Sequence, residues 1–217
     1  MFATFDRYVC AIEPPVGDRD AMEKYVEVKY ARARSYYERN HFEEAAAGFR
    51  DIALRHPGFD ASPFAANLYL ESMNVMREKW QREECVGDMR EDVPRIVKLY
   101  CEGELDEDRA GQCQVLVRVQ VHLAAIAAKD LVETAQRGGP GASALYSQAA
   151  ELYLSLWDEH GQRWCREGDV EGCRSFADIL FNAADAFQAA HLLAKAISVR
   201  KILVDPDNKL SESAPAR

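Results

Sequence analysis

The sequence predicts an all-α protein of about eight or nine helices arranged in antiparallel pairs. Three observations support this fold class. The chain has 217 residues, is rich in Ala, Leu, Glu and Arg, and contains only 12 Gly and 8 Pro, a composition that favours helix. Its apolar residues recur at helical spacing. Capping residues and Gly or Pro breakers divide it into segments of helical length, and short turns between helices of similar length make neighbours antiparallel.

The first pair of helices is expected after an extended N-terminal arm, residues 1–18, which contains two adjacent prolines and no helical period. A capping-box signal at Asp20 begins a helix that continues to about Asn40. The same signal at Asn40 begins a second helix, which ends at Pro57. The turn between them is short, so the two helices are expected to be antiparallel.

Four helices are expected in the middle of the chain. Ser62 is the expected N-cap of the first, because a proline follows it directly. The next segment is expected at roughly 83–102, and because a glycine and a proline weaken it, a start at Asp88 is the alternative. The third is long and ends at the breaker Gly138-Gly139-Pro140-Gly141. The four segments are 62–80, 83–102, 106–138 and 143–160.

The last pair of helices is expected at 170–190 and 192–204, after a short helical turn around Trp164. Asp205-Pro206 closes this pair. The helical domain is therefore predicted at 19–206. Residues 207–217 form a polar tail that is typical of the end of an excised fragment.

Small and aromatic residues in the first pair follow a spacing that resembles the tetratricopeptide repeat, and its positions are Ala33, Tyr36, Ala45, Phe49 and Pro57. The last pair repeats the pattern with Ala184, Phe187, Leu193 and Ala196. The resemblance covers about 20–57 and 174–206. The sequence from Phe49 to Pro57 is similar to that of bacterial cell-envelope members of the family. The resemblance implies a right-handed α-α superhelix, a solenoid of helical hairpins in which small residues occupy the helix crossings.

The resemblance also implies a binding surface, because the first helix of each repeat lines the concave face of such a solenoid. Rings on this face supply contact area, and the side chains of Arg34 and Asn182 are suited to bonding the backbone or carboxylates of a peptide. An alternative is that some of these residues only contact the neighbouring helix. The groove candidates are Glu27, Tyr30, Arg34, Tyr37, Phe181, Asn182 and Asp185.

The six cysteines include two close pairs, Cys101 with Cys113 and Cys165 with Cys173. A polar, glycine-containing segment separates the members of each pair, so each segment can fold back to the Cα separation that a disulfide requires. We therefore expect disulfides here, and a periplasmic or cell-envelope location rather than a cytoplasmic one. The partners of Cys10 and Cys85 stay open.

The function expected from these observations is a non-enzymatic scaffold that binds a protein or peptide. A formal charge of −9 disfavours nucleic acid, and no apolar run is long enough for a membrane span. The histidines form no ligand pair at metal-binding spacing, so neither a metal nor another cofactor is expected. Two alternatives remain open: self-association through the last pair of helices, from Leu180 to Val204, and a thiol or metal enzyme.

Overall fold

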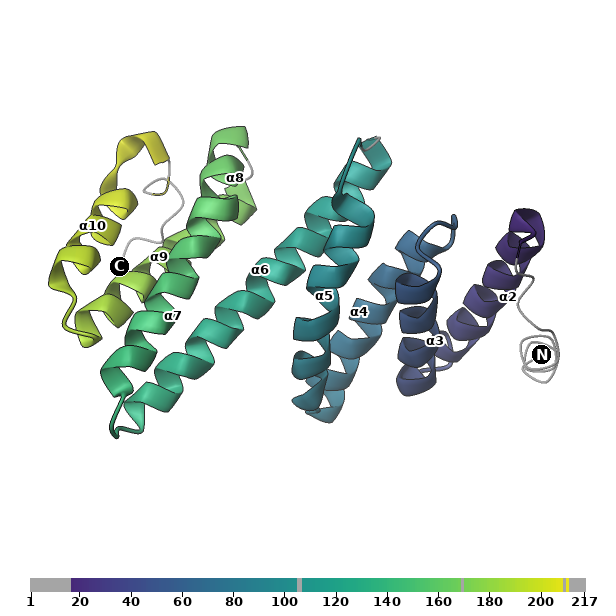
Figure 1. Ribbon diagram of the computed structural model, residues 1–217, viewed down its shortest axis with the longest axis horizontal. Coiled ribbons are helices and arrows are strands. Elements are labelled where there is room, and N and C mark those ends of the chain that lie inside the picture. The colour runs from purple at the N-terminus through teal and green to yellow at the C-terminus, as the bar shows by residue number, and fades with distance from the viewer. Residues whose placement is uncertain (1–16, 105–106, 169, 209, 211–217) are drawn as a thin grey trace. The chain divides into compact units, whose positions relative to one another are not determined.

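The computed structural model describes residues 17–104, 107–168, 170–208 and 210, and within them it is helical and contains no sheet (Figure 1). The chain divides into two compact units, Met1–Gln120 and Val121–Arg217. The helical domain expected at 19–206 spans both units. Most of the expected arm, residues 1–16, and most of the expected tail, residues 211–217, lie outside the described residues.

The first unit is a series of helices in which α2, α3, α4 and α5 pack one against the next in chain order, and the disulfide Cys101–Cys113 joins α5 to α6. The connections from α2 to α5 are short, and they bring these consecutive helices side by side (Figure 1). The fifth helix, α6, begins here and continues into the second unit. The elements are α2 (Arg19–Tyr37), α3 (Phe42–Arg55), α4 (Ser62–Trp80), α5 (Glu84–Cys101) and α6 (Glu107–Gln136).

Helices α2 and α3 approach closely because both carry a small residue at their contact. A β-carbon placed on Gly48 of α3 would lie 2.9 Å from the β-carbon of Ala33 of α2. Ala33 is buried, and Ala45 and Phe49 of α3 have no exposed surface. The expectation that Ala33 lies at a helix crossing is confirmed, and Gly48 is the partner that the sequence had not indicated.

Three helices of the first unit share a buried polar network centred on Asp92 of α5, whose side chain is fully buried. The guanidinium of Arg50 from α3 donates to both oxygens of this carboxylate, with N–O distances of 2.5 and 3.0 Å. The hydroxyl of Tyr69 from α4 donates to it at 2.7 Å. Burial alone would raise the pKa of Asp92, but these hydrogen bonds and the charge of Arg50 outweigh it and lower the pKa.

The second unit holds the rest of α6 and the helices that follow it. Helix α9 lies between two neighbours, because α7 packs against one side of it and α10 against another. In Figure 1 these three helices run alongside one another. The elements are α7 (Ala142–Leu156), the π-helical turn η1 (Trp157–Gly161), α8 (Gln162–Glu167), α9 (Val170–Ala189), α10 (Leu193–Val204) and the 3₁₀ turn η2 (Pro206–Asn208).

The core of the second unit contains two tryptophans packed edge to face against Phe176 of α9. Its ring centroid lies 5.9 Å from that of Trp157 and 5.5 Å from that of Trp164. Gly161 fits into this cluster because it has no side chain: a β-carbon there would lie 2.3 Å from the Trp157 ring and 2.9 Å from Phe176. The π-helical turn therefore depends on glycine at this position.

The hairpins α2–α3 and α9–α10 make the same backbone turn. Asn40 and His191 each adopt a left-handed conformation, with φ of 61° and 62°. The next residue in each turn donates its N–H to the same relative carbonyl of the preceding helix: His41 to Tyr36 at 3.0 Å and Leu192 to Phe187 at 2.9 Å. Ala33 and Ala184 are buried at matching positions, as are Ala45 and Ala196. The two hairpins thus correspond residue by residue.

Two of the predicted helix starts are wrong by one or two residues. Helix α2 begins at Arg19, and Asp18 is its N-cap because its carboxylate accepts the N–H of Ala21 at 3.0 Å. Asn40 does not cap α3. It lies in the left-handed turn, and His41 precedes the helix without a capping side chain.

The first residues of α4 and α5 agree in part with the helix starts that the sequence indicated. The hydroxyl of Ser62 donates to the carbonyl oxygen of His56 instead of capping α4, which begins at Ser62 itself. Helix α5 begins at Glu84, in agreement with the segment of roughly 83–102 and not with the alternative start at Asp88. Buried apolar side chains in its first two turns, Cys85, Val86 and Met89, hold it in place despite Gly87, while Pro94 lies inside the helix.

Candidate functional site

The candidate residues of the first unit form one stripe along α2. Glu27, Tyr30, Arg34 and Tyr37 are three or four residues apart, so they share one side of the helix. Glu27 and Arg34 are exposed, and the two tyrosines are half-buried. The guanidinium of Arg34 pairs with Glu38 at 3.0 Å, and both side chains are 60% exposed. An exposed pair of this kind is weak, so Arg34 can exchange it for a carboxylate on a partner.

The two tyrosines of this stripe also pack against α3. The ring of Tyr30 lies 5.7 Å from that of Phe49, and the ring of Tyr37 lies 5.5 Å from that of Phe42. Burial raises the pKa of Tyr30. Burial and a hydrogen bond to Glu71 raise the pKa of Tyr37 to about 12. Both phenols therefore stay protonated at neutral pH, and each ring contributes to the core as well as to the surface.

Helix α4 extends the stripe, and the sequence had not indicated this. The hydroxyl of Tyr37 donates to the carboxylate of Glu71 at 2.5 Å, which links α2 to α4. Phe64 lies two turns before Glu71 on the same side of α4, and it is 53% exposed. We call the six residues Glu27, Tyr30, Arg34, Tyr37, Phe64 and Glu71 the α2–α4 face. It combines exposed rings with both signs of charge.

The candidate residues of the second unit lie on α9. Phe181 is 49% exposed, and Asn182 and Asp185 are also exposed. Asp185 already accepts a hydrogen bond from the guanidinium of Arg200 on α10, at 3.1 Å. Phe181 corresponds to Tyr30 in the matching hairpin, and Asp185 corresponds to Arg34. The two hairpins therefore place an aromatic ring and a charged group at the same relative positions, with opposite charge.

A groove of about 510 Å³ follows the α2–α3 crossing. Three of its charged side chains pair with one another: the carboxylate of Asp51 binds the ammonium of Lys29 and, at 3.0 Å, the guanidinium of Arg55. Burial and the charge of Lys29 lower the pKa of His56 beside them. These contacts stabilise the hairpin, and Ala33 and Gly48 form part of the groove wall.

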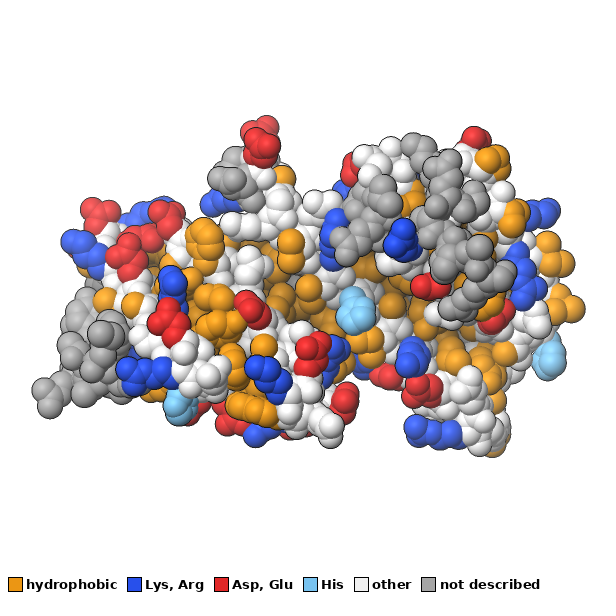
Figure 2. Space-filling view, turned by 180° about the vertical axis from the view of Figure 1, so that it is seen from behind, with side chains coloured by type: hydrophobic (Ala, Val, Ile, Leu, Met, Phe, Trp, Pro, Cys, Tyr) orange, Lys and Arg blue, Asp and Glu red, His pale blue; other side chains and the backbone are white. Residues whose placement is uncertain are grey.

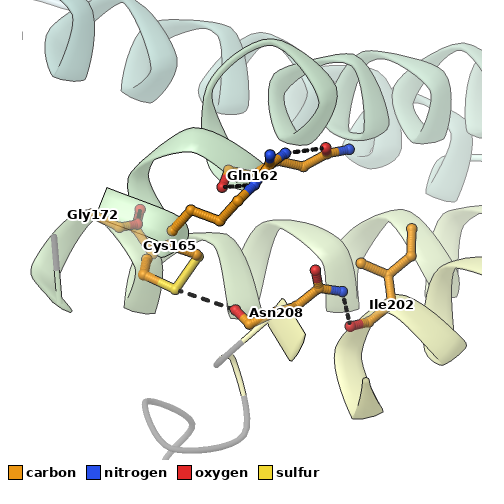
Figure 3. Close-up of a disulfide and its surroundings, with 8 residues drawn as sticks. Gln162, Cys165, Gly172, Ile202 and Asn208 are labelled. Carbon is orange, nitrogen blue, oxygen red and sulfur yellow. Dashed lines mark hydrogen bonds between the residues drawn. A yellow bond between two sulfur atoms is a disulfide. The ribbon is translucent and has the colours of Figure 1, made fainter. Parts of the chain in front are cut away.

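Both predicted disulfides are present. The Cα atoms of Cys101 and Cys113 are 5.4 Å apart, and those of Cys165 and Cys173 are 4.7 Å apart. The second bridge joins α8 to the start of α9, and the sulfur of Cys173 lies 3.9 Å from the carbonyl oxygen of Asn208 (Figure 3). Cys85 is a buried free thiol whose pKa is raised by burial. Two disulfides indicate an oxidising, extracytoplasmic compartment.

Metal and membrane sites are not seen in the part of the chain that the structure describes. No three His, Cys, Asp or Glu side chains there are grouped as metal ligands. No helix among the described residues is both long and apolar enough to cross a bilayer. Cys10 lies outside the described residues.

Hydrophobic side chains reach the surface among charged ones on the face that Figure 2 shows. Of the three tryptophans, Trp157 and Trp164 are buried, but Trp80 is 45% exposed and stacks against Phe42 with its ring centroid at 5.9 Å. Comparison with protein-family models, curated proteins and solved structures finds no match, and the site is therefore defined by this chain's own residues.

Proposed function

We propose that this protein is a scaffold of tetratricopeptide-like hairpins that binds a partner polypeptide through the exposed sides of α2, α4 and α9. The observation that carries the proposal is the α2–α4 face, where half-exposed rings and charged groups line adjacent helices. Aromatic side chains and arginine dominate the binding energy of protein interfaces, and both are present here.

The correspondence of the two hairpins supports the repeat architecture. Tyr30 and Phe181 project from matching positions, and the buried alanines of each hairpin also match. In a solenoid, first helices that repeat in this way present their exposed sides along one continuous surface. The right-handed superhelix of tetratricopeptide-like hairpins is the finer fold that we propose.

The partner is an extended or helical peptide segment in the periplasm or cell envelope of a bacterium. The disulfides support the compartment. Arg34 suits a carboxylate on the segment, and Asn182 suits its backbone. Exposed rings at Phe64 and Phe181 supply apolar contact area without requiring a deep pocket.

Affinity capture with matched variants tests this function. The purified chain captures partners from the envelope fraction of its source, and each recovered partner is then titrated against purified variants. We expect Arg34→Glu and Phe181→Ala each to weaken binding about tenfold or more. Their melting temperatures should change little, because both side chains are about half exposed or more.

Two controls match these variants. Arg55→Glu makes the same charge change on a residue that also pairs with a carboxylate four positions away, but on α3. Val115→Ala removes another exposed apolar side chain, 54% exposed on α6. Both should leave binding unchanged. If the controls weaken binding as much as the two test variants, or if all four leave it unchanged, the α2–α4 face and α9 are not the binding surface.

A further inference from the structure

Helix α10 carries an apolar stripe that is exposed. Leu193 is 59% exposed, Ile197 is 54% exposed and Val204 is 74% exposed. These residues are separated by four and seven positions, so they lie along one side of the helix. In Figure 2, hydrophobic and basic side chains appear together at the right-hand edge, where α10 lies.

The matching hairpin shows what this stripe is shaped to contact. Leu193, Ile197 and Val204 correspond to Phe42, Ala46 and Ala53 of α3, which are at most 5% exposed. Helix α4 packs along α3, and its Trp80 ring lies 5.9 Å from the ring of Phe42. The positions that α3 uses to hold a further helix are therefore the positions that α10 leaves exposed.

The charged residues of α10 indicate which kind of helix would pack against its apolar stripe. Lys201 of α10 corresponds to Arg50 of α3, which binds the carboxylate of Asp92 supplied by the next hairpin. Lys201 is exposed and forms no ion pair with any residue that the structure describes. Helix α10 contains no acidic residue, and two of its basic residues are already paired: Lys195 with Glu151 and Arg200 with Asp185. Lys201 is therefore the basic residue of α10 that remains for a partner, and an exposed ammonium beside an apolar stripe favours a partner that brings a carboxylate.

We propose that α10 is a second binding surface, which docks an acidic amphipathic helix of a partner protein in the way that α3 holds α4. The apolar side of the partner helix covers Leu193, Ile197 and Val204, and one of its carboxylates pairs with Lys201. A second copy of this chain is a poorer occupant, because two α10 helices face to face would bring their Lys201 side chains together and α10 supplies no carboxylate to pair with them. This surface is separate from the α2–α4 face and does not depend on it.

A pair of synthetic peptides tests the proposal. Both are helices of about twenty residues with the same leucine stripe, one flanked by glutamates and the other by lysines. We expect the glutamate peptide to bind the whole chain more tightly than the lysine peptide. Ile197→Glu should weaken binding of the glutamate peptide about tenfold or more, because it places a charge in the apolar stripe. Lys201→Glu should reverse the preference between the two peptides.

Val115→Glu is the control, because it puts the same charge on an exposed apolar site of α6. It should leave peptide binding unchanged. Equal affinity for the two peptides, or binding that Ile197→Glu and Lys201→Glu do not alter, would overturn the proposal. Light scattering provides a separate check: a concentration-dependent dimer that Ile197→Glu abolishes would assign the stripe to a second copy instead. The Ile197→Glu variant should still bind the partner of the α2–α4 face. That result would separate a failure of the α10 surface from a failure of the proposed function.

Discussion

The β-carbon of Ala33 occupies the space that a side chain on Gly48 would require, since a β-carbon on Gly48 would lie only 2.9 Å away. This contact fixes the distance between α2 and α3. It therefore also fixes the position of Tyr30 and Tyr37, whose rings pack from α2 onto Phe49 of α3. A close helix crossing thus positions part of the proposed binding surface.

Enlarging the residue at this crossing should separate the two helices. We expect Ala33→Leu to lower the free energy of unfolding by about 1–3 kcal/mol, because a packed contact has no room for the added atoms. Chemical denaturation monitored by circular dichroism measures the change. Ala47→Leu is the control, because Ala47 is exposed on α3. Equal effects of the two substitutions would show that the crossing is not tight.

Gly161 should be the least replaceable of the described glycines. Gly161→Ala places a β-carbon against the rings of Trp157 and Phe176, so we expect a loss of about 2 kcal/mol or more in unfolding free energy. Gly111→Ala is the matched change in α6, where a β-carbon has nothing within 4 Å. It should stabilise the helix by about 0.5–1 kcal/mol. Thermal melts of both variants check this, and a neutral Gly161→Ala would contradict the packing described for the turn.

Asp92 should make the stability of the first unit depend on pH in the acid range. Its pKa is lower in the folded protein than the value of about 3.9 for an unfolded carboxyl group. The unfolded state therefore binds more protons between the two pKa values, and the contribution of Asp92 is fully present above pH 4 and lost as pH falls through the folded pKa.

Replacing this carboxylate should remove that dependence. Asp92→Asn leaves the guanidinium of Arg50 without its anion, so we expect a loss of about 3 kcal/mol at pH 7 and a flatter acid limb in a plot of stability against pH. Urea denaturation from pH 2 to pH 7 measures both. Glu91→Gln changes an exposed carboxyl on the same helix and should have little effect. An unchanged acid limb in Asp92→Asn would refute the network.

Thiol counting tests the disulfides. Since Cys101, Cys113, Cys165 and Cys173 are bridged, at most two of the six cysteines should react after denaturation without reductant. Reducing the bridges should lower the free energy of unfolding by about 2–4 kcal/mol for each one. Six reactive thiols in protein purified without reductant would remove the evidence for an extracytoplasmic compartment.

Local signals in the sequence predicted most of the fold. Helical period and breakers placed the α-helices that the structure describes, but not the π-helical and 3₁₀ turns, and the cysteine spacing identified both bridges. These features depend on neighbouring residues. Helix starts were less accurate: Asn40 has a good capping side chain, but the turn places it in the left-handed region. Contacts between residues far apart in the sequence could not be predicted from local patterns. Examples are Gly48 at the helix crossing and Gly161 among the aromatic rings.

The candidate site was predicted in part. The helical spacing of Glu27, Tyr30, Arg34 and Tyr37 gave one stripe on α2, but it could not show that both tyrosines also pack on α3. Phe64 and Glu71 were missed because α4 departs from the spacing of the first hairpin. The last pair of helices, from Leu180 to Val204, was named as a surface for self-association, but the sequence alone did not show which side of α10 is exposed.

Hydrogen–deuterium exchange of the chain with and without its captured partner tests the central claim most directly. A partner that binds the proposed surface should slow exchange in peptides from α2, α4 and α9, and Arg34→Glu and Phe181→Ala should diminish that protection. Slowed exchange confined to α10 would support the second surface alone. Protection that falls on neither set of helices, or no change at partner concentrations that saturate binding, would contradict the account.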